Sequence, residues 1–323
     1  MYGIEELKSR IVVTENEVIC PVKECLVHVK RQRVSFKKMQ DYYCDEHGIF
    51  ISPSTFEYYK ELDNIIWNDE TDINLLRRIK KVKRESRMAR DNSEDAVTWN
   101  IFRYLEIADI LEKFLRNLNS QKQNSVNDII YWSYSQKENG SWSQLNRARI
   151  EFGEQLNRSS EPDIILITDS TLFFVECKLL AGNKTTPSNK EVSKKYTTGG
   201  NEWYGKVFRS EYNNVAITEG KYELLRFWLL GTWLAEQLGL SFYLINVVPD
   251  LREQDIEERF SKHIYIDESK KFKRISWESL YQFIKDVAPD GKDKDIILNY
   301  FTNKTIGYKN RRLQPAFNLQ RYT

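Results

Sequence analysis

Two acidic residues and a lysine have the types and spacing needed to bind a divalent cation. Asp163 opens the run PDIILIT, and Glu176 and Lys178 lie in the next run, TLFFVECKLL. Only residues 169–170 separate the two apolar runs, which is typical of a β-hairpin. Lys178 lies on the same face as Glu176 because side chains alternate along a strand. We predict that the two carboxylates hold Mg²⁺ or Mn²⁺ and that the ammonium positions an attacking water.

The length of the turn fixes which residues of the hairpin oppose each other. With residues 169–170 as the turn, the numbers of paired residues add up to 339, and Asp163 falls opposite Glu176. Like charges in opposed positions repel, so we expect a cation to compensate them. In the alternative interpretation these are ordinary strand-end acids, and Lys178 pairs with Glu161, which lies opposite it in the same register.

A second group of potential ligands lies near the start of the sequence. Cys20-x4-Cys25 and Cys44-x2-His47 are two ligand pairs separated by eighteen residues, a spacing typical of a four-ligand structural zinc site. We therefore predict one Zn²⁺ held by these four side chains in a zinc-ribbon-like module. His28 competes for a place because Cys25-x2-His28 also has ligand spacing, and ordinary buried cysteines are the simpler alternative.

Glu94 is a candidate third acid for the divalent cation. It lies three residues before Val97 and seven before Ile101, so it shares the apolar face of a predicted helix. A glutamate in the first turn of a helix also interacts favourably with the helix dipole, and this alternative stays open.

Arg226 stands out because it lies in an otherwise apolar helical stretch, one turn after Tyr222. We predict that Arg226, with Tyr222 beside it, contacts a scissile phosphate. An ion pair with Glu223, three residues earlier on the same helix, explains the arginine equally well.

The elements that must position these residues follow from the hydrophobic periodicity. A capped amphipathic pattern predicts a helix from about residue 92 to 115, and apolar runs predict three strands, then a helix and a final buried strand. The predicted strands are 127–135, 162–168, 171–180 and 241–248, and the second helix is 221–239. Residues 181–218 are polar and contain glycine, which predicts a long surface loop.

The chain divides into four predicted segments. These are a zinc-binding module at 1–65, a charged helical connector at 66–90, a core at 91–250 and a mostly helical extension at 251–323. Within the module, KRQRVSFKK at residues 30–38 is basic enough to follow a phosphate backbone, with a solvated hairpin tip as the alternative.

The sequence around the hairpin resembles a known superfamily. Pro162-Asp163, twelve intervening residues and Glu176-Cys177-Lys178 are similar to the PD-(D/E)XK motif of restriction-endonuclease-like nucleases. The resemblance implies an α/β fold with an αβββαβ core, in which helices flank a mixed central sheet. It also implies that Glu94 assists the metal ion, because an acid on the first helix is common there. The glutamine-tyrosine signature of the branch that resembles the RecB exonuclease is missing.

These observations together predict a Mg²⁺-dependent endonuclease acting on DNA, with RNA not excluded, that serves in restriction or anti-phage defence and forms a homodimer. A non-catalytic zinc-containing nucleic-acid-binding protein is the alternative. The 49 basic and 47 acidic residues give a net charge of +2, so overall charge favours neither. We expect a cytoplasmic protein, because no apolar run reaches the roughly 18 residues of a membrane span and the first residues lack a signal-peptide pattern.

Overall fold

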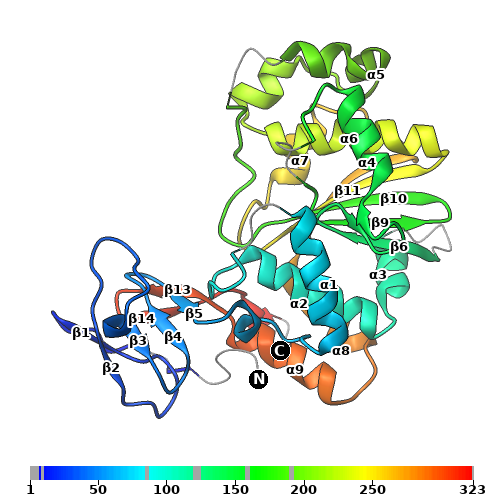
Figure 1. Ribbon diagram of the computed structural model, residues 1–323. Helices are drawn as coiled ribbons and strands as arrows, with labels where there is room; N and C mark the ends of the chain where they lie inside the picture. Colours follow the sequence, from blue (N-terminus) through cyan, green and yellow to red (C-terminus); the bar gives the residue numbers. More distant parts are fainter. Residues whose placement is uncertain are drawn as a thin grey trace. The chain divides into compact units, whose positions relative to one another are not determined.

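The computed structural model describes residues 7–8, 11–83, 87–118, 125–156, 161–188 and 193–321. The chain forms two compact units (Figure 1). The first unit contains the described residues of Met1–Ile73, Ser86–Ile110 and Trp277–Thr323, and the second contains those of Asn74–Glu85 and Leu111–Ser276.

A seven-stranded mixed sheet forms the centre of the second unit, in the order β12-β11-β10-β9-β6-β7-β8. β10 pairs in parallel with β11, and β11 with β12, whereas the remaining neighbours are antiparallel. The strands are β6 (Val126–Tyr131), β7 (Tyr134–Ser135), β8 (Gly140–Ser141), β9 (Ile164–Thr168), β10 (Thr171–Cys177), β11 (Ser241–Val248) and β12 (Lys270–Ser276). The α/β fold with a mixed sheet flanked by helices therefore agrees with the prediction.

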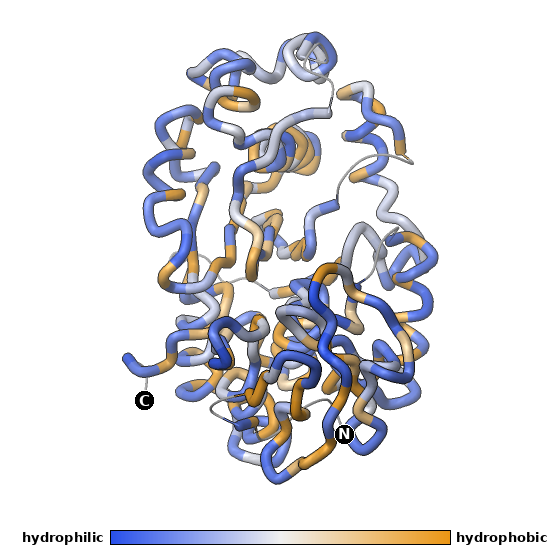
Figure 2. Tube along the Cα trace, turned by 90° about the vertical axis from the view of Figure 1, so that its left-hand side faces the viewer, coloured by the Kyte–Doolittle hydropathy of each residue, from blue (hydrophilic) through white to orange (hydrophobic). Residues whose placement is uncertain are grey.

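Helix α6 (Tyr222–Leu238) packs its apolar surface on one face of this sheet. Leu172 and Phe174 of β10 and Ile165 of β9 belong to the buried core that α6 completes. A Cβ atom at Gly231 would overlap the ring of Phe242, so this glycine allows the helix to lie close to β11. In Figure 2, hydrophobic and hydrophilic colours alternate along most of the trace.

The remaining helices of the second unit include three that the sequence did not predict, namely α4, α5 and η3. The remaining helices are residues 74–82 of α1 (Glu70–Val82), α3 (Leu111–Leu118), α4 (Ser143–Glu151), α5 (Ser193–Val207), the π-helix η3 (Asn214–Thr218) and α7 (Ile256–Ser261). The prediction of a continuous surface loop at 181–218 was wrong, because α5 and η3 lie within it. α5 has non-helical backbone from Gly199 to Glu202, and the glycine pair there hides its helical pattern.

β12 is the second departure from the prediction, which made residues 251–323 mostly helical. It forms the edge of the sheet beside β11, and only Phe272 and Ser276 of its seven residues are buried. Its sequence, KKFKRIS, therefore has a charged, solvated composition that protects an edge from further pairing. Such a strand lacks the apolar run by which buried strands are recognised.

The first unit holds the small β-rich module at the start of the chain. β1 pairs with β2, and β3, β4 and β5 form a three-stranded sheet. The elements are β1 (Glu17–Ile19), β2 (His28–Lys30), η1 (Gln40–Tyr42), β3 (Tyr43–Cys44), β4 (Ile49–Ile51), β5 (Phe56–Tyr58) and η2 (Glu61–Asn64). Residues from the end of the chain form α8 (Trp277–Val287), α9 (Lys292–Asn303), β13 (Thr305–Lys309), β14 (Arg312–Pro315) and η4 (Leu319–Arg321).

Helix α2 (Glu94–Ile107) also belongs to the first unit. Ser93 caps it by accepting a hydrogen bond from the Ala96 amide at 3.1 Å, which confirms the predicted start. The predicted helix to residue 115 is in fact two helices, because Asp109 has a left-handed backbone with φ 54° and α3 begins after it. α1 (Glu70–Val82) is likewise more than a solvated connector, since Leu75, Leu76 and Ile79 are buried.

The two units do not coincide with the four predicted segments, because α2 and the end of the chain group with the cysteine-bearing module. Compact units do not by themselves define domain boundaries, so those boundaries stay a prediction. None of the helices in the described residues is both long enough and apolar enough to cross a membrane.

Candidate active site and metal centre

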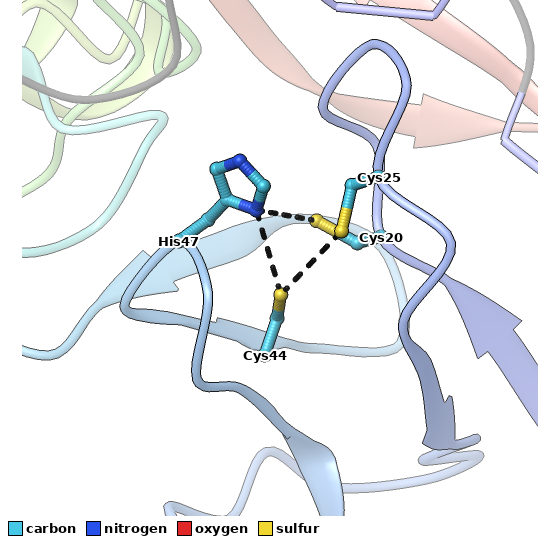
Figure 3. A group of neighbouring side chains, drawn as sticks. All are labelled: Cys20, Cys25, Cys44 and His47. Carbon is cyan, nitrogen blue, oxygen red and sulfur yellow. Dashed lines mark hydrogen bonds between the residues drawn. The ribbon is translucent and has the colours of Figure 1, made fainter.

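The three cysteines and the histidine of the zinc prediction converge in the structure (Figure 3). The ligand atoms of Cys20, Cys25, Cys44 and His47 all lie within 4.8 Å of one another. A tetrahedral zinc site places two sulfurs about 3.8 Å apart and a sulfur and a nitrogen about 3.6 Å apart. The Cys25–Cys44 sulfur distance is 3.9 Å, and His47 Nδ1 lies 3.6 Å from Cys44 Sγ and 3.8 Å from Cys20 Sγ. This group can therefore hold a metal ion such as zinc.

Two tight turns bring these ligands together. Cys20 follows β1, and the turn to Cys25 contains Glu24 in a left-handed conformation with φ 65°. Lys8 donates its ammonium to the Cys20 and Cys25 carbonyl oxygens and so fixes the first turn. Cys44 ends β3, and Gly48, with φ 64°, closes the second turn after His47. Glycine is favoured there because it adopts positive φ without strain.

His28 does not belong to this group. It is exposed on β2, and its Nδ1 lies 3.1 Å from Glu17 Oε2. His28 therefore does not compete with the four ligands. The basic segment 30–38 is partly neutralised, because Lys30 pairs with Asp41 at 2.7 Å and Lys38 with Glu57 at 2.6 Å. Its contact with phosphate stays a prediction.

The hairpin of β9 and β10 has the predicted register. Val175 pairs with Ile164 and Leu172 with Ile167, so the next position along the ladder places Asp163 opposite Glu176. Side chains alternate along each strand, and residues of the same parity, such as Phe174, pack toward α6. Asp163 and Glu176 therefore share the α6 side of the hairpin, as predicted.

Lys178 bridges two glutamates at the end of β10. Its ammonium donates to Glu176 Oε1 and, at 2.9 Å, to Glu223 Oε2. Glu223 lies in the first turn of α6. The side chains of Glu176 and Lys178 are only 4% and 9% exposed, whereas that of Glu223 is 20% exposed. The three side chains form a charged cluster that is nearly closed to solvent.

The cluster carries more negative than positive charge. Burial raises the pKa of Glu176 well above its usual value, and the charges of Glu223 and Asp163 raise it further, while Lys178 opposes them. Burial also acts to raise the pKa of Glu223, but the ammonium of Lys178 holds it below its ordinary value. Oε2 of Glu176 is buried, and no donor in the described part of the chain reaches it. A buried carboxylate oxygen without a donor is costly and fits a site that takes up a cation.

Asp163 is fixed at its place by two N–H groups. Its Oδ1 accepts from the Trp132 indole at 3.0 Å and its Oδ2 from the Cys177 amide at 2.8 Å. Trp132 and Ser133 have φ values of 45° and 70° and form the turn between β6 and β7. Non-glycine residues with positive φ are uncommon and occur often at functional sites. This turn aims the indole at the carboxylate.

Glu94 and the hairpin cluster belong to different units of the fold. It is the first residue of α2, is partly buried, and belongs to the first unit, whereas Asp163, Glu176 and Lys178 belong to the second. Its role as a metal ligand stays a prediction.

Arg226 forms a buried ion pair that the sequence did not indicate. Its guanidinium donates to both carboxylate oxygens of Glu154, at 2.7 and 2.6 Å. Tyr196 donates to the same carboxylate at 3.0 Å and lies 3.0 Å from the hydroxyl of Tyr222. Arg226 and Tyr222 thus belong to one hydrogen-bonded network, and their contact with a phosphate stays a prediction.

Sequence reasoning missed Glu223, Trp132 and Glu154 as parts of the site and its support. Glu223 was considered only as a helical partner of Arg226, and a first-turn acid gives no further signal. Trp132 appeared only within a predicted strand. Comparison with known proteins adds no information, since no family model, curated protein or solved structure matches this chain.

Proposed function

We propose that this protein is a metal-dependent nuclease of the PD-(D/E)XK, restriction-endonuclease-like superfamily that hydrolyses phosphodiester bonds in DNA. The observation that carries the proposal is the buried Glu176 carboxylate, which meets Lys178 on one oxygen and no donor in the described residues on the other. A carboxylate in that state accommodates a cation, and an adjacent ammonium is suited to phosphate chemistry. Within the second unit, the neighbouring strands β6, β9, β10 and β11, with α6 between β10 and β11 in the chain, also support the proposed core.

Each residue of the hairpin has a defined part in this proposal. Asp163 and Glu176 would hold Mg²⁺ or Mn²⁺, with Glu94 as a further ligand, and the ion would polarise the phosphate and lower the pKa of a bound water. Lys178 places an ammonium beside the reacting group, where it can donate to a phosphate oxygen or orient the water. Trp132 holds Asp163 in one orientation through its indole N–H. Arg226 and Tyr222 are the proposed phosphate contacts.

The biological role that we propose is restriction or anti-phage defence in the cytoplasm. Cleavage of both DNA strands by a single kind of site favours a homodimer, in which two copies present two sites. The zinc module would contribute binding to the backbone through residues 30–38, of which Arg31, Arg33 and Lys37 are exposed. RNA is the second substrate class to be tested.

The experiment incubates plasmid DNA, linear DNA and RNA with the zinc-loaded protein in Mg²⁺, Mn²⁺ or chelator. We expect metal-dependent cleavage that Asp163→Asn and Lys178→Ala both reduce by at least about 10²-fold, as is common when a group that acts in the transition state is removed. Asp169→Asn is the matched control, since this carboxylate lies exposed at the turn of the same hairpin, where it accepts from Asn127. Equal activity of all variants would contradict the assignment.

The second candidate is a zinc-containing nucleic-acid-binding protein without catalytic activity. One observation favours it. Among the described residues, the cysteine-histidine group brings its ligand atoms within 4.8 Å, whereas no group of three acids at the hairpin does so. DNA binding that persists in chelator-free buffer without any cleavage, in every metal tested, would support this candidate over the nuclease.

A further inference from the structure

Three carboxylates and one ammonium meet in the hairpin cluster. Asp163, Glu176 and Glu223 contribute three carboxylates, and Lys178 is the ammonium that pairs with the two glutamates. The neighbouring Arg226 is committed to Glu154 in a bidentate pair. A bound divalent cation would balance the two negative charges that arise when all three carboxylates are ionised, in a place where burial makes uncompensated charge expensive.

Two of the three carboxylates, those of Glu176 and Glu223, lie against the Lys178 ammonium. Oε1 of Glu176 accepts from Lys178, but Oε2 is buried without a donor in the described residues. The Glu223 carboxylate accepts a hydrogen bond from the same ammonium at 2.9 Å. Glu176 and Glu223 are therefore the two carboxylates that share one cationic partner.

Backbone interactions fix Glu223 in this position. Thr185 accepts a hydrogen bond from the Glu223 amide at 2.9 Å through its hydroxyl, and it also forms a parallel bridge with Lys221. The segment that follows Lys178 thus holds the first turn of α6 beside the end of β10. Because Glu223 is the most exposed of the three bridged side chains, it marks the side of the cluster that solvent and ions can reach.

We propose that Glu223 is a ligand of the catalytic divalent cation together with Glu176, and that Lys178 occupies the cation's place between the two carboxylates when no cation is bound. This inference rests on the proposed nuclease function and adds a residue that the superfamily resemblance did not supply. It predicts an unusual property of Lys178. The lysine is needed for cleavage, yet it competes with the cation for the same carboxylates.

The test measures Mn²⁺ binding to the zinc-loaded full chain by electron paramagnetic resonance, without nucleic acid. We expect Glu223→Gln to weaken Mn²⁺ binding by at least about tenfold, which is the lower end of the effect of losing even an outer partner of a metal site. Lys178→Met keeps the length of the side chain without its charge and should tighten Mn²⁺ binding while abolishing cleavage. Glu219→Gln is the matched control, because this carboxylate, four residues before Glu223, pairs with Lys262 and Arg259 instead.

The outcomes separate this inference from the proposed function. Wild-type protein that cleaves DNA and binds Mn²⁺, together with unchanged Mn²⁺ binding by Glu223→Gln, would overturn the role of Glu223 and leave the nuclease proposal intact. Weaker Mn²⁺ binding by Lys178→Met would overturn the competition. Wild-type protein that neither binds Mn²⁺ nor cleaves nucleic acid would refute the nuclease proposal itself. If Glu223→Gln does not fold, Glu223→Asp decides, since a carboxylate drawn back by one methylene should also bind Mn²⁺ more weakly.

Discussion

The buried ion pair between Glu154 and Arg226 allows a quantitative test of how the site is supported. The side chains are 2% and 3% exposed and are joined by two short hydrogen bonds. Glu154→Gln keeps the size of the side chain and an oxygen that can accept from Tyr196, but it removes the charge opposite Arg226. The arginine cannot lose its proton, so it remains as an uncompensated buried cation.

The size of the effect follows from this burial. Breaking a buried pair by removing one partner destabilises a protein by about 3–5 kcal/mol, because the other charge stays desolvated. For a domain of roughly 150–250 residues, 1 kcal/mol corresponds to about 2–4 °C in melting temperature, so Tm should fall by roughly 6–20 °C. The double variant Glu154→Leu, Arg226→Met removes both charges, and most of the lost stability should return.

Urea unfolding followed by circular dichroism measures the free energy of unfolding for wild type, for Glu154→Gln and for the double variant. Glu219→Gln is the control, since its partners Arg259 and Lys262 are about half exposed and such pairs contribute roughly 0–1 kcal/mol. The reasoning is wrong if Glu154→Gln lowers the free energy of unfolding no more than Glu219→Gln does. It is equally wrong if the double variant is as unstable as Glu154→Gln alone.

The same pair bears on the predicted phosphate contact of Arg226. Arg226→Lys keeps a positive charge but loses the two parallel hydrogen bonds to Glu154. If the arginine mainly supports the fold, this variant should lose stability while KM for DNA stays unchanged at a temperature where it is folded. A large increase in KM without loss of stability would instead assign Arg226 to the phosphate.

Four further predictions follow from the same contacts. Burial would raise the pKa of Glu154, but Arg226 holds this pKa below its ordinary value. The stabilisation by the Glu154 carboxylate should therefore be present above about pH 4.5 and disappear as pH falls through the lowered pKa. The difference in free energy of unfolding between wild type and Glu154→Gln should accordingly shrink in acid. Trp132→Phe removes a donor to Asp163 and should cost about 1.5–3 kcal/mol in urea unfolding. Glu176→Gln should raise Tm in chelator and abolish the Tm increase caused by Mn²⁺. Elemental analysis should find about one zinc per chain and much less in Cys44→Ser.

The hairpin could be predicted in detail because its determinants are local. A two-residue turn and a side-chain period of two fix the register, and the observed pairs of β9 and β10 follow it. The zinc ligands were predictable for the same reason, since each pair lies on one short turn and the spacing within a pair sets its geometry.

The partners of these residues could not be predicted because they come from distant parts of the chain. Glu223 reaches Lys178 from 45 residues away, and Glu154 reaches Arg226 from 72 residues away. In both cases the sequence offers a local partner at helical spacing, and the fold uses another. β12 was missed for a different reason, because an edge strand rich in lysine has almost no buried residues by which to recognise it.

Two buried acids of the second unit, Glu154 and Glu176, differ in how their carboxylates are satisfied. Arg226 donates to both carboxylate oxygens of Glu154, so their pair joins the segment after α4 to α6 without demanding any ligand. The Glu176 side chain is 4% exposed, close to the 2% and 3% of Glu154 and Arg226, yet its Oε2 has no hydrogen-bond donor among the described residues. A fold under selection for stability alone would replace that carboxylate by an amide or an apolar side chain at little cost. Its presence beside Lys178 and Glu223 is the basis on which we propose a cation site there.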